Sequence, residues 1–202
     1  MLVGLGMAAA VTIVVGIALL GSTILAVLAV GQAIVVITRN IDLSVGSVLG
    51  LSAFVTGLLF ADHDIPIVLA FVVGIVIGAV CGVINGVLVA VCRIPALVVT
   101  LGTMYIWRGV AYSWAGGDQV TASELPKHFL GFANSSILGI PWPVLVALVV
   151  VLGVTVVMRN YRAGRELYAM GSSPDAAELA GIKVSRNLIG AFLVSGALAG
   201  LA

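Results

Sequence analysis

Four long runs without a charged residue constrain this chain more than any other feature of its sequence. They cover residues 1–38, 43–61, 65–92 and 129–158. Because one helical crossing of a bilayer core needs about 20 apolar residues, each run is long enough to cross a membrane. Strands of a membrane β-barrel would instead alternate apolar and polar residues over about ten positions. The runs therefore predict an all-α integral membrane protein, a polytopic helical bundle.

Composition agrees with a membrane protein and argues against other classes. The chain is 62% hydrophobic and 8% charged, whereas soluble domains carry about 25% charged residues. A disordered chain would combine low hydrophobicity with a high net charge, and the net charge here is +1. So small a charge gives no basic surface for a nucleic acid, and we expect no nucleic-acid partner.

Charged and proline-containing breaks divide the chain into about 6–7 transmembrane helices, within a single domain, 1–202. We expect these helices at about 2–20, 23–38, 44–60, 66–92, 95–114, 141–158 and from residue 187 onward, with a polar loop between the fifth and sixth. The last apolar stretch holds only 16 residues and has no cap or basic flank, so we expect the chain to be a fragment of a longer membrane protein.

Basic residues predict the orientation of the helices. They gather in alternate loops, at Arg39, Arg93, Arg159, Arg162, Arg165, Lys183 and Arg186. The intervening loops contain mainly acidic residues, Asp62, Asp64, Asp118 and Glu124, with Lys127 as their basic residue. Because cytoplasmic loops carry an excess of Lys and Arg, we expect Arg39, Arg93 and the segment 159–186 in the cytoplasm.

A short helix with signals at both ends is expected within this cytoplasmic segment, at 174–180. Ser173 is a preferred N-cap, Pro174 suits the first helical position and Gly181 suits the stop. Asp175 and Glu178 favour the positive end of the helix dipole. The small side chains of Ala176, Ala177 and Ala180 suit close approach by another surface, or packing on the chain's own bundle.

Several sequence blocks resemble a known family of transporters. GSSPDAAELAGI followed by VSGALAGLA resembles the cytoplasmic coupling loop and next helix of ABC-importer permeases of the ribose, rhamnose and autoinducer-2 group. GQAIVVITRNIDLSVGS, IPALVVTLGTMYIWRG and AGG at 115–117 agree with it. Many relatives have Gly-Gly in place of Arg39-Asn40 and Gly-x-Asn in place of 171–173. The version found here is similar to the rhamnose and autoinducer-2 branches.

The resemblance implies a permease subunit in a bacterial plasma membrane, which passes a sugar or sugar-like solute into the cytoplasm. Rhamnose or autoinducer-2 is the first choice, ahead of ribose or xylose. Implied partners are a second permease, identical or different, two ATP-binding cassette subunits, and a periplasmic or lipid-anchored binding protein. The chain itself then needs no cofactor, since ATP is bound by a partner. The coupling helix would use Ser173, Pro174, Asp175, Ala176, Ala177, Glu178, Ala180 and Gly181.

Two other functions stay open, a secondary transporter and a membrane assembly subunit without transport. Scarce acids within the spans argue against proton coupling. The chain has two histidines and neither a protease motif nor a phosphate-binding glycine loop, so we expect no enzyme activity. His63 lies between Asp62 and Asp64 in an external loop, too few ligands for a metal site.

Arg108 is the most informative charged residue within a predicted span. Arginine at the centre of a membrane helix costs about 2.5–3.5 kcal/mol, so an unpaired position facing lipid is disfavoured. One interpretation is that Arg108 faces the solute pathway or a partner subunit. The other is that it extends to the outer interface or binds a local acceptor such as Asp118.

Other polar residues of the spans allow two interpretations each. Gln32, Asn85, Thr100 and Thr103 either join helices by hydrogen bonds or contact a sugar. Asp42, followed by Ser44, either caps the third span or belongs to an inner gate with Arg39. Four glycines spaced four residues apart, Gly74, Gly78, Gly82 and Gly86, predict close approach of another helix. Cys81 and Cys92 are expected to be apolar packing residues of one span.

Overall fold

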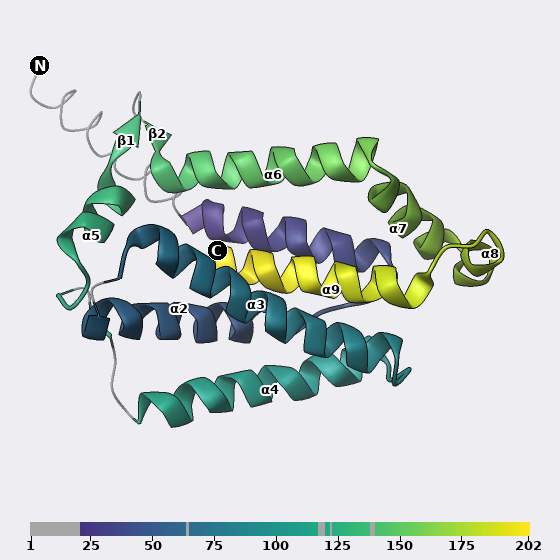
Figure 1. The fold of residues 1–202 in the computed structure, drawn as a ribbon, viewed down its shortest axis with the longest axis horizontal. Coiled ribbons are helices and arrows are strands. Elements are labelled where there is room, and N and C mark those ends of the chain that lie inside the picture. Colours follow the sequence, from purple (N-terminus) through teal and green to yellow (C-terminus); the bar gives the residue numbers. More distant parts are fainter. Residues whose placement is uncertain (1–20, 64, 117–119, 122, 138–139) are drawn as a thin grey trace, which may run out of the picture.

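The computed structural model describes residues 21–202 except 64, 117–119, 122 and 138–139. Long helices run side by side along one axis of the molecule (Figure 1). They are an unlabelled helix Gly21–Ile37, α2 (Val45–His63), α3 (Ile67–Ala90), α4 (Ala96–Ala115), α6 (Trp142–Asn160) and α9 (Val184–Leu201). The predicted all-α architecture is confirmed. The helix expected at 2–20 lies outside the described residues.

Prolines set the starts of three long helices close to the expected positions. Pro66, Pro95 and Pro141 occupy the N-cap positions of α3, α4 and α6. By length and composition, α2, α3, α6 and α9 can each cross a membrane, and Gly21–Ile37 is a shorter apolar helix. The helix α4 has the length but is too polar to meet the same criterion.

The glycine stripe of α3 packs directly on the backbone of α9. A Cβ atom on Gly74 would lie 2.5 Å from the carbonyl oxygen of Gly200, and one on Gly78 would overlap the carbonyl oxygen of Gly196. One on Gly86 would lie 2.8 Å from Cα of Ile189. The two backbones therefore touch along most of the bundle, and the predicted close approach of another helix is confirmed.

The loop expected at 116–141 contains regular structure near its end. It includes α5 (Lys127–Asn134) and two short antiparallel strands, β1 (Ser136–Ile137) and β2 (Ile140–Pro141). The ring of Phe129 lies 4.7 Å from that of Phe60, and the ring of Phe132 lies 5.7 Å from that of Trp142. These aromatic contacts hold α5 against the ends of α2 and α6 and explain why the segment is not an open polar loop.

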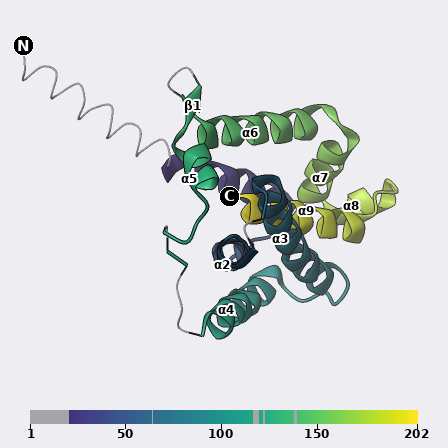
Figure 2. The same cartoon turned by 60° about the vertical axis from the view of Figure 1, so that its left-hand side comes forward.

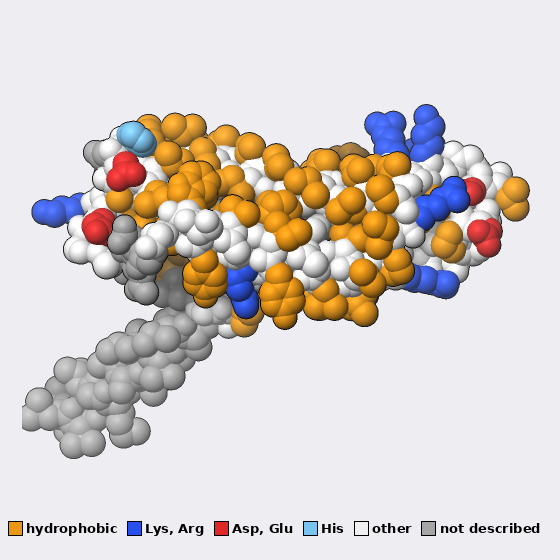
Figure 3. All heavy atoms as spheres, turned by 90° about the horizontal axis from the view of Figure 1, so that it is seen from below, with side chains coloured by type: hydrophobic (Ala, Val, Ile, Leu, Met, Phe, Trp, Pro, Cys, Tyr) orange, Lys and Arg blue, Asp and Glu red, His pale blue; other side chains and the backbone are white. Residues whose placement is uncertain are grey.

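A second unexpected helix, α7 (Arg162–Ser172), precedes α8 (Pro174–Leu179). Its buried residues Gly164, Leu167 and Met170 recur every three positions and form one apolar face. Leu167 packs with Ile34 and Ala191. Most Lys and Arg side chains gather at the end of the molecule formed by α7, α8 and the loops at Arg39 and Arg93, hereafter the basic end (Figure 3).

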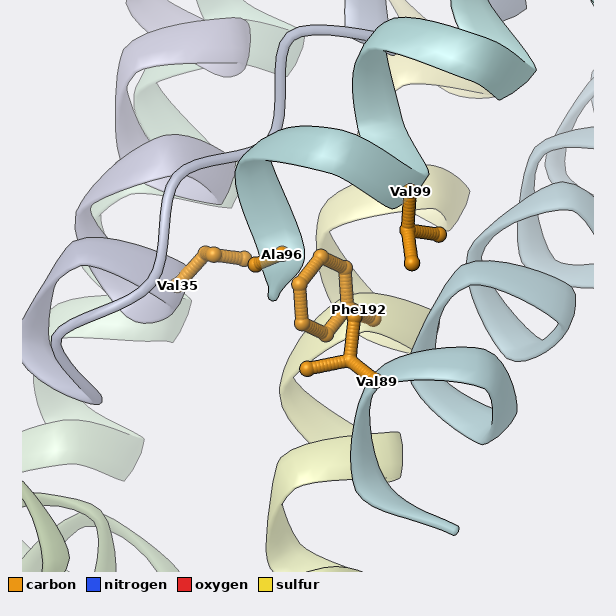
Figure 4. Close-up of a cluster of buried hydrophobic side chains, with 5 residues drawn as sticks. All are labelled: Val35, Val89, Ala96, Val99 and Phe192. Carbon is orange, nitrogen blue, oxygen red and sulfur yellow. The ribbon is translucent and has the colours of Figure 1, made fainter. Parts of the chain in front are cut away.

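A compact apolar cluster joins four helices near the basic end. Its members are Val35, Val89, Ala96, Val99 and Phe192 (Figure 4). The Phe192 ring is fully buried and points from α9 into the space between α3, α4 and the Gly21–Ile37 helix. This cluster fixes the end of the Gly21–Ile37 helix, where the loop 38–44 begins, against α3, α4 and α9.

The two cysteines lie in different surroundings, contrary to the single packing role expected for them. Cys81 is buried within α3, whereas Cys92 follows the end of that helix and is exposed. Both are free thiols. The α3 helix ends at Ala90, two residues earlier than predicted, and this shorter end leaves Cys92 in the connection to α4.

Candidate functional site

A groove of about 690 Å³ runs between α2 and α4. Its walls are Gly46, Ser47, Gly50, Leu51, Ala53 and Phe54 of α2, Arg108, Ala111, Tyr112 and Ala115 of α4, and Val120. No heavy atom lies within 4 Å of where a Cβ would project from Gly46 or Gly50. The small residues of α2 therefore leave open space opposite the larger side chains of α4. We call this feature the α2–α4 groove.

Arg108 brings a charge into the α2–α4 groove. Its side chain is exposed and forms no hydrogen bond or ion pair with any residue that the structure describes. Asp118, one expected acceptor, lies outside those residues. Tyr112 lies one turn further along α4 and is exposed. The buried hydroxyl oxygen of Ser47 has no partner in the described part of the chain. The groove thus presents a guanidinium and the Tyr112 hydroxyl, which can hydrogen-bond solute hydroxyls, whereas the Ser47 hydroxyl is closed off from solvent.

Sequence reasoning identified Arg108 but missed Ser47 and Tyr112. A signal was present in α2, where Gly46, Gly50 and Ala53 recur at the spacing of one helical face. A face of such small residues leaves room beside a helix. Their pairing with α4 depends on the fold and is not visible in either segment alone.

Three of the other polar candidates lie inside the bundle rather than in the α2–α4 groove. Asn85 is fully buried and its Nδ2 donates to Ser44 Oγ at 2.8 Å. Thr100, also fully buried, donates to the carbonyl of Ala96 at 2.8 Å and to that of Ile41 at 3.3 Å. Thr103 Oγ1 has its nearest acceptor in its own helix, the carbonyl of Thr100 at 3.4 Å. The contacts of Asn85 and Thr100 join their helices to residues 41–44 and favour a packing role over sugar contact, whereas the bond of Thr103 stays within α4.

Gln32 is half-buried in the Gly21–Ile37 helix. Its Nε2 is buried and has no partner among the described residues. It does not line the α2–α4 groove. A role for Gln32 in the solute pathway stays a prediction.

Asp42 and Ser44 together begin α2. Asp42 Oδ1 accepts hydrogen bonds from the backbone N–H of Ser44 at 2.9 Å and from its hydroxyl at 2.6 Å. The carbonyl of Ser44 then accepts the N–H groups of Ser47 and Val48, in the first turn of the helix. Burial raises the pKa of the Asp42 carboxyl, and the hydrogen bonds from Ser44 oppose that shift. The geometry is an Asx-turn, in which Asp42 orients Ser44 directly before the first residue of α2.

Arg39 and Asp42 form no ion pair with one another, and their membership of an inner gate stays a prediction. The Nη2 of Arg39 instead donates to the carbonyl of Ser172 at 2.7 Å. Arg39 therefore links the loop 38–44 to the end of α7, 133 positions away in sequence. A partner so distant in the chain could not be identified from local spacing.

The helix α8 forms as predicted, but the residues exposed on it differ from those expected. Ser173 Oγ accepts the N–H of Ala176 at 3.3 Å, and Gly181 has a φ of 80° at the helix stop. Ala177, however, is 3% exposed. Its carbonyl accepts the N–H of Ile182, because the chain folds back after α8. A bulky residue at 177 would therefore disturb the chain's own packing, contrary to the expectation of an exposed docking alanine.

The exposed face of α8 consists of other residues. Leu179 is 91% exposed, a large value for an apolar side chain. Around it Asp175, Ala176, Glu178 and Ala180 are also exposed. The end of α8 thus projects an apolar side chain beside two acidic ones, away from the bundle.

Comparison with known proteins identifies the family of this helical bundle. The family model described as branched-chain amino acid transport system / permease component matches residues 13–202. The chain belongs to this permease family. A protein of this permease family with several apolar helices is a multi-pass protein of the plasma membrane, as the sequence predicted.

Relatives of this permease include proteins of two transport systems. The chain is 37% identical to the autoinducer 2 import system permease protein LsrC of Enterobacter sp. (strain 638), over 90% of the chain and 52% of the relative. It is 33% identical to the D-allose transport system permease protein AlsC of Escherichia coli (strain K12), over 90% of the chain and 55% of the relative. The chain spans about half the length of these curated relatives. No solved structure matches it.

Proposed function

We propose that this chain is part of the permease subunit of an ABC importer for a sugar or sugar-like solute. The solute would arrive from a binding protein, and partner ATP-binding cassette subunits would hydrolyse the ATP. A second permease subunit would complete the pathway. Support comes from the relatives, whose names refer to autoinducer 2 and D-allose. Solutes of these two kinds are therefore the first to test, whereas neither relative points to rhamnose.

The observation that carries this proposal is the exposed end of α8. A helix of six residues is marginal in water, and α8 is held by its Ser173 cap, its proline start and its glycine stop. It can therefore present Leu179 as a rigid projection. An apolar side chain beside Asp175 and Glu178 fits an apolar pocket with basic residues at its rim. We assign that pocket to the ATPase subunit.

The α2–α4 groove is the proposed solute route along this chain. Its volume of about 690 Å³ lies within the range of small-molecule sites, about 300–1,000 Å³. Arg108 and Tyr112 provide hydrogen-bond donors, whereas Leu51 and Phe54 provide apolar contact. Such a mixed surface fits the hydroxyl groups and C–H faces of a sugar.

A secondary transporter is the weaker alternative. Proton-coupled carriers use ionisable side chains within the membrane. Among the described residues the one buried carboxylate is that of Asp42, and Ser44 occupies it at the start of α2. This arrangement favours a structural role for the acid over proton relay.

The test is to assemble the full-length permease with its ATPase subunits and binding protein in lipid nanodiscs. We expect Leu179→Asp to lower the amount of ATPase that co-purifies and to abolish ATP hydrolysis stimulated by loaded binding protein. Tyr168→Asp, which changes an exposed side chain of α7, is the matched control and should retain both. Normal ATPase assembly in Leu179→Asp would contradict the docking role of α8.

A further inference from the structure

We propose that Arg39 is a positioning residue that transmits movement of α8 to the helices around the α2–α4 groove. Its guanidinium would hold the junction of α7 and α8 against the end of the Gly21–Ile37 helix. Any displacement of α8 would then reach the loop 38–44, from which α2 begins. This role rests on the proposed docking of α8 on an ATPase.

Two adjacent contacts join this junction to the bundle. Arg39 Nη2 donates to the carbonyl of Ser172 at 2.7 Å, and Ser172 is the last residue of α7. Ser173, the N-cap of α8, follows directly. At Gly171 a Cβ would overlap the carbonyl oxygen of Ile37, so the two backbones touch there. The start of α8 is thus fixed to residues 37 and 39 at once.

The backbone of Arg39 has the left-handed conformation found at the ends of helices. Its φ of 61° lies in the left-handed region, which is disfavoured for a non-glycine residue. Such a conformation persists when its surroundings determine it. Here the N–H of Arg39 donates to the carbonyl of Val36 at 2.9 Å, which closes the end of the helix, while the guanidinium reaches Ser172.

Hydrogen bonds continue from Arg39 through the loop to the neighbouring helices. Asn40 Nδ2 donates to the carbonyl of Thr38 at 2.8 Å, and the carbonyl of Ile41 accepts from Thr100 of α4 at 3.3 Å. Asp42 and Ser44 begin α2, and Ser44 accepts a hydrogen bond from Asn85 of α3. The loop therefore contacts both helices that line the α2–α4 groove.

A second connection between α8 and the bundle does not involve Arg39. The chain passes from α8 to α9 through residues 180–183, so α9 follows any movement of α8 directly. Glu166 of α7 also accepts a hydrogen bond from Asn187 of α9 at 2.7 Å. What Arg39 adds is the connection to the Gly21–Ile37 helix and the loop after it. Loss of Arg39 should therefore weaken coupling without detaching α8.

The first measurement is hydrogen exchange of residues 162–180 in the full-length permease in nanodiscs. In Arg39→Gly we expect residues 162–180 to exchange about fivefold faster. This factor corresponds to a loss of about 1 kcal/mol of local stability. Arg93→Gly is the matched control. Arg93 is also exposed, at the basic end, with a φ of 55°, and its side chain forms no hydrogen bond with the described residues. Glycine relieves the backbone equally at both positions, so only the lost Ser172 contact differs.

The second measurement is ATP hydrolysis by the assembled complex, with and without loaded binding protein. We expect Arg39→Gly to lower the stimulation of ATP hydrolysis about fivefold, while the amount of assembled ATPase stays the same. Fivefold is the factor that corresponds to the same loss of about 1 kcal/mol. Arg39→Lys should retain part of the stimulation, since an ammonium can donate one hydrogen bond to the same carbonyl. Arg93→Gly should behave as wild type.

Three results would overturn the proposal in different ways. Unchanged exchange in Arg39→Gly would show that the contact does not hold the junction. Faster exchange with normal stimulation would show that the contact does not transmit movement. A wild-type complex whose ATP hydrolysis ignores the loaded binding protein would overturn the proposed function and the coupling role together, and exchange would still report on the Ser172 contact.

Discussion

The two outermost helices, α4 and α6, lie on opposite sides of the bundle and present different surfaces (Figures 1 and 2). Over residues 142–158 of α6 the exposed large side chains are all aliphatic, namely Leu148, Val149, Leu152, Val156 and Val157, and Arg159 follows at the basic end. On α4 the exposed face begins with aliphatic residues but continues with Tyr105, Arg108 and Tyr112 on one side of the helix. Exposure alone therefore does not identify a lipid-facing helix.

What covers each surface follows from its chemistry. Aliphatic side chains have no hydrogen bonds to lose in lipid, so α6 suits direct contact with acyl chains. An arginine and two phenolic hydroxyls lose hydrogen bonds there, so this part of α4 suits water, a solute or a protein partner. The same difference explains why α6 has the composition of a membrane span and α4 does not.

The largest expected effect comes from placing an arginine on each surface. Leu152 and Tyr105 lie near the middle of their helices and are 55% and 66% exposed. We expect Leu152→Arg to lower the amount of permease in the membrane strongly, because arginine at a helix centre costs about 2.5–3.5 kcal/mol. Tyr105→Arg should be inserted nearly normally beside Arg108. Quantitative blotting of membrane fractions measures both, and equal losses would remove the distinction between α4 and α6.

Removal of Arg108 should have the next largest effect, on transport rather than on insertion. Losing hydrogen bonds from a charged group to a solute costs about 1.5–3 kcal/mol, so uptake by Arg108→Leu should fall at least about tenfold. Arg108→Lys should retain part of it, because lysine keeps the charge but not the planar fork of donors. Uptake of labelled D-allose and autoinducer 2 measures this, with Arg93→Leu as the control, because Arg93 is exposed and its side chain forms no hydrogen bond with the described residues.

Near-wild-type uptake by both Arg108 variants would favour the other interpretation of this residue. Arg108 would then extend toward the outer interface and take no part in solute passage. The α2–α4 groove would lose its one charged donor, and the solute route would have to be placed elsewhere.

Sequence predicted those features that depend on short spacing. The breaks at Pro66 and Pro95 and the glycine contacts of α3 each follow from a few neighbouring residues, and the structure has them. The caps of α8 are equally local. In these cases a residue type restricts its own backbone or leaves space beside it, so no knowledge of the fold is needed.

Other features depend on surfaces that exist only after folding. The apolar face of α7 becomes recognisable through what it covers, since Leu167 packs on Ile34 and Ala191 from distant helices. Likewise Ala177 is buried because the chain turns back after α8. Arg39 has Ser172 as its acceptor rather than the nearby Asp42. Each case needed a contact between segments far apart in sequence.

A smaller effect is expected from filling space beside α2 and α6 with the same side chain. Neither Gly50 nor Gly153 has a heavy atom within 4 Å of its missing Cβ. Gly50→Leu and Gly153→Leu should therefore both insert and fold, and leucine favours the helix by up to about 1 kcal/mol over glycine. We expect severalfold slower uptake for Gly50→Leu, which narrows the α2–α4 groove, and normal uptake for Gly153→Leu. The opposite ranking would place the route beside α6.

The smallest expected effect concerns how each outer helix is attached at the basic end. On the α4 side the attachment uses Thr100, which has no charge to lose. The α6 side is attached through α7, where Glu166 accepts hydrogen bonds from Asn187 and Arg162. These two contacts, Asn187 first, lower the pKa of Glu166 below its ordinary value.

A lowered pKa in the folded state fixes the direction of the pH effect. The stabilisation is complete above the unfolded pKa of glutamate, about 4.3, and is lost as the pH falls through the lower folded value. We therefore expect acidification below about pH 4.3 to lower the protection of α7 against hydrogen exchange, taken relative to the intrinsic exchange rate at each pH, and Glu166→Gln to remove this pH dependence. Exchange in the first turns of α4, measured in the same samples, should not respond to Glu166→Gln. If the pH dependence of α7 were unchanged in Glu166→Gln, another titrating group would hold this helix. The proposed difference between the attachments of α4 and α6 would then be wrong.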